Sequence, residues 1–264
     1  MRVAPLPPWL DAARLLGEGD WQLTRYPSFI EATAELDAPV AADLGARLRG
    51  VTLAGKPVEY EVTPRLARTL VRQARLEEAR RHRDRSVGFS RPGAMIDDET
   101  RLGLTPEALA LDLGKRARDV AHAPTVIDLC CGVGGNAIGF ARSGLRVIAI
   151  EIDPHRLAAA RHNAALYGVA DRIAFFQGDA RDYLTGHEDA LLFADVPWAV
   201  RDASGHLPLL RDIVARCARG QQLWAKVPAD FDPALVPNAQ PVAWFGANAG
   251  DRRRVKFLVL ELKG

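Results

Sequence analysis

An acidic residue and several glycines follow one apolar run of this chain. The segment Val126-Ile-Asp-Leu-Cys-Cys-Gly-Val-Gly-Gly-Asn-Ala137 places Asp128 four residues before Gly132, and Gly134 comes next. A strand that feeds such a turn and then a helix presents backbone N–H groups and a helix N-terminus to a ligand. Gly132 and Gly134 permit a sharp turn, and Ala137 permits close packing of helix and strand. The pattern therefore predicts a cofactor site.

The acids narrow the choice of cofactor. The glycines alone leave open a nicotinamide or flavin dinucleotide, or a purely structural turn. An acid at position 128 instead suits a ligand with an ammonium group, such as the methionine end of S-adenosylmethionine. Glu151 ends a second apolar run 23 residues after Asp128, where a carboxylate is placed to bind ribose hydroxyls.

A third apolar run, residues 172–177, is followed by Asp179 and Ala180. Asp179 is placed to accept a hydrogen bond from the adenine amino group, while the Ala180 N–H meets a ring nitrogen. The alternative for Asp179 is a turn or helix-cap residue. Acids at three successive strand ends predict S-adenosylmethionine as the cofactor.

The segment Asp195-Val-Pro-Trp198 closes a fourth apolar run and has the composition of an acceptor site for amine methylation. An exocyclic base amine is weakly nucleophilic, so acceptors must hold its hydrogens as positive charge develops on methyl attack. Asp195 offers a carboxylate, Pro197 restricts the loop, and Trp198 offers a face on which a base stacks. The alternative is structural: Trp198 would cover the core and Asp195 would cap a helix.

Alternating strand and helix patterns from Thr125 onward must position these residues. Further strands are expected at 190–195 and 222–227, and residues 241–245 and 255–262 are expected to pair at the sheet edge. We predict an α/β fold: a Rossmann-like, doubly wound, mostly parallel sheet with an antiparallel C-terminal edge strand. Asp153-Pro154 is a helix start signal, and Gly168 is a plausible stop.

Residues 1–86 have a different pattern and predict a smaller, mainly helical accessory domain, with residues 87–264 as the catalytic domain. A helix near 40–49, a short hairpin within 51–62 and an arginine-rich helix near 64–83 are expected. Residues 65–85 hold eight arginines against three acids, and Arg252 to Lys256 form a second basic cluster. Both are candidate RNA contacts, although a solvated charged face is the alternative.

The overall composition limits the classes of protein to which this chain can belong. The chain has 264 residues, 48% of them hydrophobic, and a net charge of +2, so it can bury a substantial core. It has no run of 18 apolar residues and no pattern of a signal peptide, so we expect no membrane association and a cytoplasmic location. Its three cysteines and six histidines have no zinc-ligand spacing, and we expect no metal. For Cys130 and Cys131 a redox or nucleophilic role is less favoured than packing at a tight turn.

Three segments carry a specific family resemblance. Residues 131–141, 146–154 and 158–171 resemble the trimethylguanosine synthase family, the RNA cap guanine-N2 methyltransferases, which are class I S-adenosylmethionine-dependent enzymes. Upstream, residues 88–99 and 104–110 resemble the family's segment that folds over cofactor and substrate. The resemblance covers roughly residues 88–262 and leaves the first 86 unexplained.

The resemblance implies roles for individual residues. Asp195, Pro197 and Trp198 would form the acceptor site, with Trp198 stacking on guanine and Asp195 at the amine. The residues expected to contact the cofactor are Asp128, Cys130, Gly132, Gly134, Asn136, Glu151, Ile152, Asp179, Ala180, Phe89 and Thr105.

The chain departs from the family at two points. The family has Ser-Pro-Pro-Trp followed by two glycines, where this chain has Asp-Val-Pro-Trp-Ala-Val, and Glu151 stands where aspartate is usual. The changed loop bears on which acceptor the protein uses.

From the resemblance and the acceptor segment together, we expect a methyltransferase that acts on an exocyclic amine of a base in RNA, with guanine N2 as the first choice. The alternatives are another acceptor (adenine N6, a small amine or a protein) and a non-catalytic binding module with the same fold.

Overall fold

The computed structural model describes residues 1–17, 19–81, 88–121, 123–187, 189–199, 202, 205, 207–246 and 255–263. The chain divides into two compact units. Unit 1 comprises Met1–Arg85, Ala229–Asp232 and Ala243–Phe257, and unit 2 comprises Ser86–Pro228, Pro233–Val242 and Leu258–Gly264. The division after Arg85 lies one residue from the expected boundary, but two later segments belong to unit 1 rather than to one continuous C-terminal domain.

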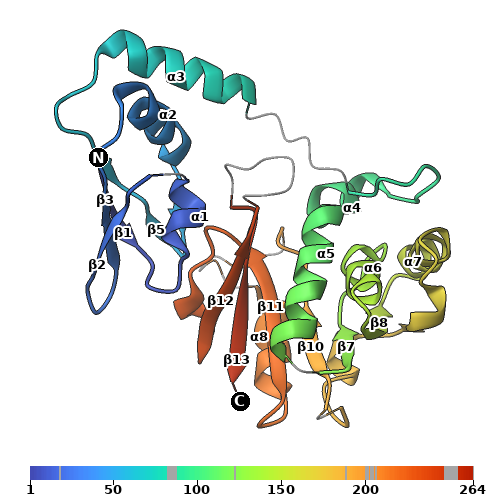
Figure 1. Ribbon diagram of the computed structural model, residues 1–264. Coiled ribbons are helices and arrows are strands. Elements are labelled where there is room, and N and C mark those ends of the chain that lie inside the picture. Colours follow the sequence, from blue (N-terminus) through green and yellow to red (C-terminus); the bar gives the residue numbers. More distant parts are fainter. Residues whose placement is uncertain are drawn as a thin grey trace. The chain divides into compact units, whose positions relative to one another are not determined.

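A mixed seven-stranded sheet forms the framework of unit 2 (Figure 1). Its strands are β7 (Thr125–Asp128), β8 (Arg146–Glu151), β9 (Ile173–Gln177), β10 (Leu191–Ala194), β11 (Gln222–Pro228), β12 (Ala239–Phe245) and β13 (Phe257–Lys263). The spatial order is β12-β13-β11-β10-β7-β8-β9. The four pairings from β9 through β8, β7 and β10 to β11 are parallel. The predicted α/β fold with a mostly parallel sheet is confirmed.

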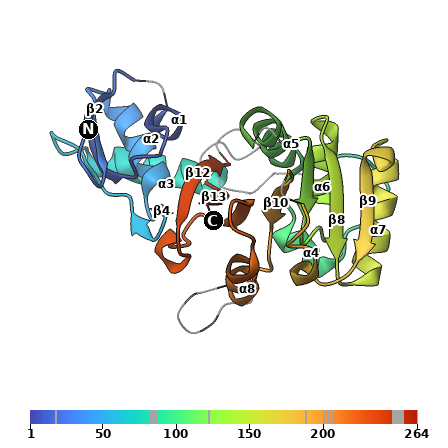
Figure 2. The same ribbon diagram turned by 90° about the horizontal axis from the view of Figure 1, so that it is seen from below.

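Helices flank this sheet on both faces. They are α4 (Asp98–Gly103), α5 (Glu107–Arg116), α6 (Gly135–Arg142), α7 (Pro154–Leu166) and α8 (Pro208–Arg216). Figure 2 shows α5 and α8 on opposite sides of the sheet. Helix α7 begins as expected, because the Asp153 side chain accepts hydrogen bonds from the backbone N–H groups of His155 and Arg156, and Pro154 occupies the first turn.

The core explains why the strands read as apolar runs. Parallel strands covered by helices on both faces bury consecutive residues, and all four residues of β10 are buried. Phe140 of α6 meets Phe193 of β10 edge to face, with ring centroids 5.0 Å apart. Strand β10 pairs in parallel with β7, and Phe193 lies opposite Asp128, so the strand ends that carry Asp128 and Asp195 are neighbours in the sheet.

Unit 1 contains more strand than the sequence predicts. A four-stranded sheet has the order β2-β3-β1-β6, formed by β1 (Arg2–Leu6), β2 (Gln22–Arg25), β3 (Ile30–Thr33) and β6 (Tyr60–Glu61), with antiparallel pairings. The expected hairpin is β4 (Thr52–Leu53) with β5 (Lys56–Pro57). Its helices are α1 (Ala12–Leu16), α2 (Ala38–Leu48) and α3 (Arg68–Arg81). The unit is therefore mixed rather than mainly helical.

Within the described part of the chain, no helix is long and apolar enough to cross a membrane.

Candidate functional site

The turn between β7 and α6 is the scaffold of the site. Its backbone is tied to both neighbouring strands, because the Leu129 N–H donates to the Phe193 carbonyl at 2.9 Å and the Cys131 N–H to the Ile150 carbonyl at 2.8 Å. Gly132 has φ 55° and Gly134 has φ 93°, in the left-handed region that favours glycine. A Cβ at Gly134 would also lie 3.3 Å from Ala160 of α7. The predicted need for glycine at both positions is therefore explained by the backbone, and at 134 by packing too.

Asp128 is a buried acid with no adequate partner. Its residue is 0% exposed, and neither carboxylate oxygen has a hydrogen-bond partner of normal geometry among the described residues. Burial raises its pKa to about 8; the nearby Asp195 and Glu151 carboxylates add to this, while the Cys130 backbone N–H and Lys226 oppose it. Such a carboxylate is stabilised by a cation, and the ammonium of S-adenosylmethionine would supply one.

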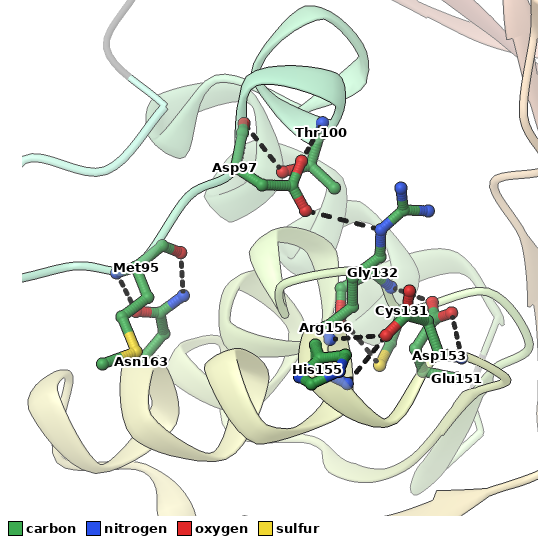
Figure 3. Close-up of polar contacts among 10 residues, drawn as sticks. All are labelled: Met95, Asp97, Thr100, Cys131, Gly132, Glu151, Asp153, His155, Arg156 and Asn163. Carbon is green, nitrogen blue, oxygen red and sulfur yellow. Dashed lines mark hydrogen bonds and ion pairs between the residues drawn. The ribbon is translucent and has the colours of Figure 1, made fainter.

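Glu151 is held in place by the turn itself. Its Oε2 accepts from the Gly132 N–H at 2.8 Å, and its Oε1 accepts from the Asp153 N–H at 3.0 Å (Figure 3). Each carboxylate oxygen has a second lone pair for another donor. Glu151 therefore has lone pairs available for further donors, and its role with ribose hydroxyls stays a prediction.

The end of β10 forms a polar cluster around Asp195. Oδ2 of this residue accepts from Nζ of Lys226 at 2.6 Å and from Nδ2 of Asn136 at 2.8 Å. Both bonds end on Oδ2, so neither of them uses Oδ1 of this carboxylate. The amide nitrogen of Asn136 binds Asp195, and its buried Oδ1 has no partner within the described residues. The expected contact of Asn136 with the cofactor stays a prediction.

Lys226 is a site residue that the sequence analysis did not identify. It lies on β11, its side chain is 1% exposed, and its Nζ is 4.5 Å from the centre of the Trp198 ring. The Trp198 Nε1 donates to the Lys226 carbonyl at 3.3 Å. One lysine thus binds both the acid and the aromatic residue of the predicted acceptor site. The only signal in the sequence is a charged residue inside an otherwise apolar strand.

These residues surround one cavity of about 390 Å³, within the size range of small-molecule sites. Its lining brings together residues from the turn, from the loop after β10 and from α4 and the residues that follow it. Among the predicted residues the lining includes Thr105, Cys130, Gly132, Asn136, Glu151, Asp195, Pro197 and Trp198. Asp128 lies buried behind the turn, and Gly134 shapes the turn from outside the lining.

Thr105 and Leu104 close one side of this cavity. Thr105 is 2% exposed, and its hydroxyl has no hydrogen-bond partner within the described part of the chain. Gly135 at the start of α6 packs closely against Leu104, because a Cβ built on Gly135 would lie 2.6 Å from the end of the Leu104 side chain, which would have to shift to make room for it. The unpaired hydroxyl of Thr105, the carboxylate of Asp128 and the amide oxygen of Asn136 are the polar groups that a bound cofactor or substrate would satisfy.

The residues before α5 are fastened to the core by polar contacts (Figure 3). The backbone of Met95 donates to and accepts from the Asn163 side chain of α7, at 2.7 and 2.9 Å. Arg156, which lines the cavity, pairs with Asp97 at 3.5 Å. These contacts hold α4 against the cavity.

Four further predicted residues are not among those that line this cavity. Asp179 caps the short turn Ala180–Asp182 and pairs with the Arg181 side chain, so the cap role left open by the sequence is the one observed. The Arg181 hydrogen bonds lower the pKa of Asp179 to about 2. Ala180 is buried, Ile152 is 65% exposed, and Phe89 contacts the Tyr167 ring. Their contacts with cofactor stay a prediction.

The cysteines of the turn are not activated. Burial raises the pKa of both the Cys130 and Cys131 thiols well above the usual value, and nearby Asp128 raises it further. A thiol in this state is a poor nucleophile, which favours the packing role. Arg252 to Arg254 of the second basic cluster lie outside the described residues.

If the strands of this sheet are numbered along the chain from β7 as strand 1 to β13 as strand 7, their order in the sheet is 3-2-1-4-5-7-6. A glycine turn follows the first strand, and acids lie at the ends of the first, second and fourth. This order and this site define the class I S-adenosylmethionine-dependent methyltransferases. Within that class, residues 123–202 match the family described as RNA cap guanine-N2 methyltransferase. The predicted resemblance is confirmed over this segment, and S-adenosylmethionine is the cofactor of both the class and the family.

Two trimethylguanosine synthases are among the proteins to which this chain is similar in sequence. The chain is 37% identical over 125 residues to trimethylguanosine synthase of Schizosaccharomyces pombe, covering 44% of this chain and 52% of that protein. It is 29% identical over 109 residues to trimethylguanosine synthase of Saccharomyces cerevisiae, covering 39% and 35%. The chain thus spans about half or less of these relatives. A solved RNA methyltransferase from Salinibacter ruber in complex with S-adenosyl-L-homocysteine is 25% identical, with 60% and 91% covered and a TM-score of 0.38.

Proposed function

We propose that this protein transfers a methyl group from S-adenosylmethionine to an exocyclic amine of a base in RNA, with guanine N2 as the acceptor. The observation that carries the proposal is the Asp195 carboxylate beside the Trp198 ring, on the wall of the cavity that also holds Glu151 and Gly132. A carboxylate and an aromatic face beside a cofactor cavity are what amine methylation of a base requires. The match of residues 123–202 to a guanine-N2 methyltransferase family supports the choice of guanine.

The protein residues would act by positioning and electrostatics. The cofactor, when bound, supplies an electrophilic methyl group. Oδ1 of Asp195 would accept a hydrogen bond from the base amine and stabilise the positive charge that develops on its nitrogen. Trp198 would stack on the base, a contact worth about 1–3 kcal/mol per base. Lys226 would keep Asp195 and Trp198 in one fixed arrangement, since it binds both.

The identity of the acceptor can be tested directly. We would incubate the protein with methyl-deuterated S-adenosylmethionine and total cellular RNA, digest the RNA, and identify labelled nucleosides by mass spectrometry. We expect labelled N2-methylguanosine. Labelled N6-methyladenosine would show that the acceptor is adenine rather than guanine. Label found only in protein or small molecules would refute an RNA acceptor.

A pair of variants links the activity to the site. Asp195→Asn keeps the size of the side chain but removes the charge, and we expect a rate loss of about 10²–10³-fold with little change in cofactor affinity. Asp171→Asn, at an exposed position in the same unit, is the matched control and should keep wild-type activity. Equal rates for the two variants would contradict the assigned role of Asp195.

A further inference from the structure

Unit 1 contains a groove that the methyltransferase site does not use. It lies between the β6 region and α3, has a volume of about 420 Å³, and is lined by Arg65, Arg68, Arg72, Arg75 and Tyr60 together with apolar residues. Among the described residues that line it, none is acidic. We name these five residues the arginine groove.

The arginines share one side of α3. Arg68, Arg72 and Arg75 are separated by four and three residues, which places them on one helix face with neighbours about 5–6 Å apart. All four arginines of the groove are exposed. Within the described residues, none of the four forms a hydrogen bond or ion pair with an acid, so their charges are available to a partner.

The rest of α3 is engaged elsewhere. Ala74 and Glu78, one turn apart, are buried on the side toward α2. The Glu77 carboxylate accepts a hydrogen bond from Nε2 of Gln73 at 3.2 Å, and neither Glu77 nor Gln73 lines the groove. The acids of this helix therefore do not neutralise the arginine face, which distinguishes it from a helix face of mixed, solvated charges.

Tyr60 gives the groove an aromatic wall. A Cβ built on Gly45 of α2 would lie 2.8 Å from the Tyr60 ring, so the ring rests closely on this helix. The ring is only partly exposed and is thus held rigidly at the edge of the groove. Guanidinium groups in a row beside a fixed aromatic ring suit a single-stranded nucleic acid, whose phosphates pair with arginine and whose bases stack.

We propose that the arginine groove binds a single-stranded segment of the RNA substrate through its phosphates, with one base stacked on Tyr60. The choice of RNA among polyanions rests on the function proposed above. The groove would supply affinity without sequence selection, because phosphate contacts carry no base information. The nucleotide to be methylated is then selected by the separate site around Asp195.

The test is the salt dependence of binding. A 20-nucleotide oligouridylate would be titrated into the full-length protein at several salt concentrations between 50 and 200 mM. For single strands the slope of log K against log salt is about −0.7 per phosphate contact, so the triple variant Arg68→Gln, Arg72→Gln, Arg75→Gln should reduce the slope by about 2. We also expect at least tenfold weaker binding at the lowest salt.

Matched control variants distinguish RNA binding at the arginine groove from a general effect of positive charge on the protein surface. Arg118, Arg146 and Arg172 are exposed in unit 2, near the amino ends of its strands, so their triple replacement by glutamine removes the same charge elsewhere. Tyr60→Leu should weaken binding about fivefold or more through lost stacking, whereas Tyr60→Phe keeps the ring and should bind like the wild type.

The outcomes discriminate between the two proposals. Equal slopes for the two triple variants, no RNA binding by the wild type, or equally tight binding of polyglutamate would overturn the arginine groove as an RNA site, even if labelled N2-methylguanosine is found. Groove-dependent RNA binding without any labelled nucleoside would support the groove and refute the proposed methylation instead. Melting temperatures of the triple variants should match that of the wild type.

Discussion

Replacement of Asp128 by asparagine is the most informative single change, because it removes a charge that the protein itself destabilises. In the ligand-free protein the pKa of Asp128 is raised from 3.8 to about 8, chiefly by burial. A raised pKa means that the folded state binds a proton more tightly than the unfolded state does. The free energy of unfolding therefore falls as pH rises from about 4 to 8.

The magnitude follows from the size of the shift. Each pKa unit corresponds to about 1.4 kcal/mol, so a shift of about four units costs on the order of 5 kcal/mol once Asp128 is ionised. Asp128→Asn carries no such cost, and we expect it to be more stable than the wild type by several kcal/mol at pH 8. At pH 4 the two proteins should unfold at similar denaturant concentrations.

The same shift predicts how cofactor affinity depends on pH. A ligand ammonium binds the ionised carboxylate, whose fraction rises about tenfold per pH unit below 8. Titration with S-adenosylhomocysteine should therefore give an affinity that rises about 100-fold between pH 5.5 and 7.5, with release of a proton on binding. Asp128→Asn should bind weakly, and its affinity should change little over this range.

Parallel stability profiles of the wild type and Asp128→Asn between pH 4 and 8 would refute the raised pKa of Asp128. Equal pH dependence of ligand affinity in the two proteins would also refute it, because it would place the titrating group elsewhere.

Three further changes test the surrounding contacts. Lys226→Met leaves the Asp195 carboxylate without its buried partner and should lower the free energy of unfolding by about 3–5 kcal/mol in urea titrations. The double variant Lys226→Met, Asp195→Asn should recover most of this loss. Additive losses from the two changes would contradict the ion pair. Glu151→Gln should weaken S-adenosylhomocysteine binding by about 10–100-fold in calorimetry, and an unchanged affinity would refute the ribose assignment. Burial raises the pKa of Glu107, but hydrogen bonds from Tyr167, Ser90 and Arg142 lower it to about 2. The ionised Glu107 carboxylate therefore stabilises the folded state above pH 4.5, and this stabilisation is lost as the pH falls toward 2. Glu107→Gln should lose about 1–3 kcal/mol at pH 7 and little at pH 2, and equal losses at both values would contradict the assignment.

The sequence predicted the site best where chemistry and local structure coincide. The acid, the glycines and the apolar run of the Asp128 turn are contiguous, so both the left-handed glycines and the parallel strand follow from one short segment. Asp195 and Trp198 were predictable for the same reason, since both lie where a strand ends. Each of these assignments needed only local spacing and the rule that ligands bind at the carboxyl ends of parallel strands.

Contacts across the sheet could not be predicted in this way. Lys226 reads as an irregular residue of an apolar strand, and its pairing with Asp195 depends on β11 lying next to β10. Asp179 also follows a strand, but its pairing with Arg181, two residues later, cannot be inferred from its position at a strand end. In unit 1 the strand β2 is exposed along its whole length and shows no buried alternation, so no periodic signal marked it.

The charges around the cavity have a consequence for turnover. Asp128, Glu151 and Asp195 carry three carboxylates, and the ammonium of Lys226 is in direct contact with that of Asp195. With all three carboxylates ionised, the cluster retains negative charge. S-adenosylmethionine carries a sulfonium charge that its demethylated product lacks, so the pocket attracts the charged donor more strongly than the spent one. If these acids bind the cofactor as predicted, they also favour its exchange after each reaction.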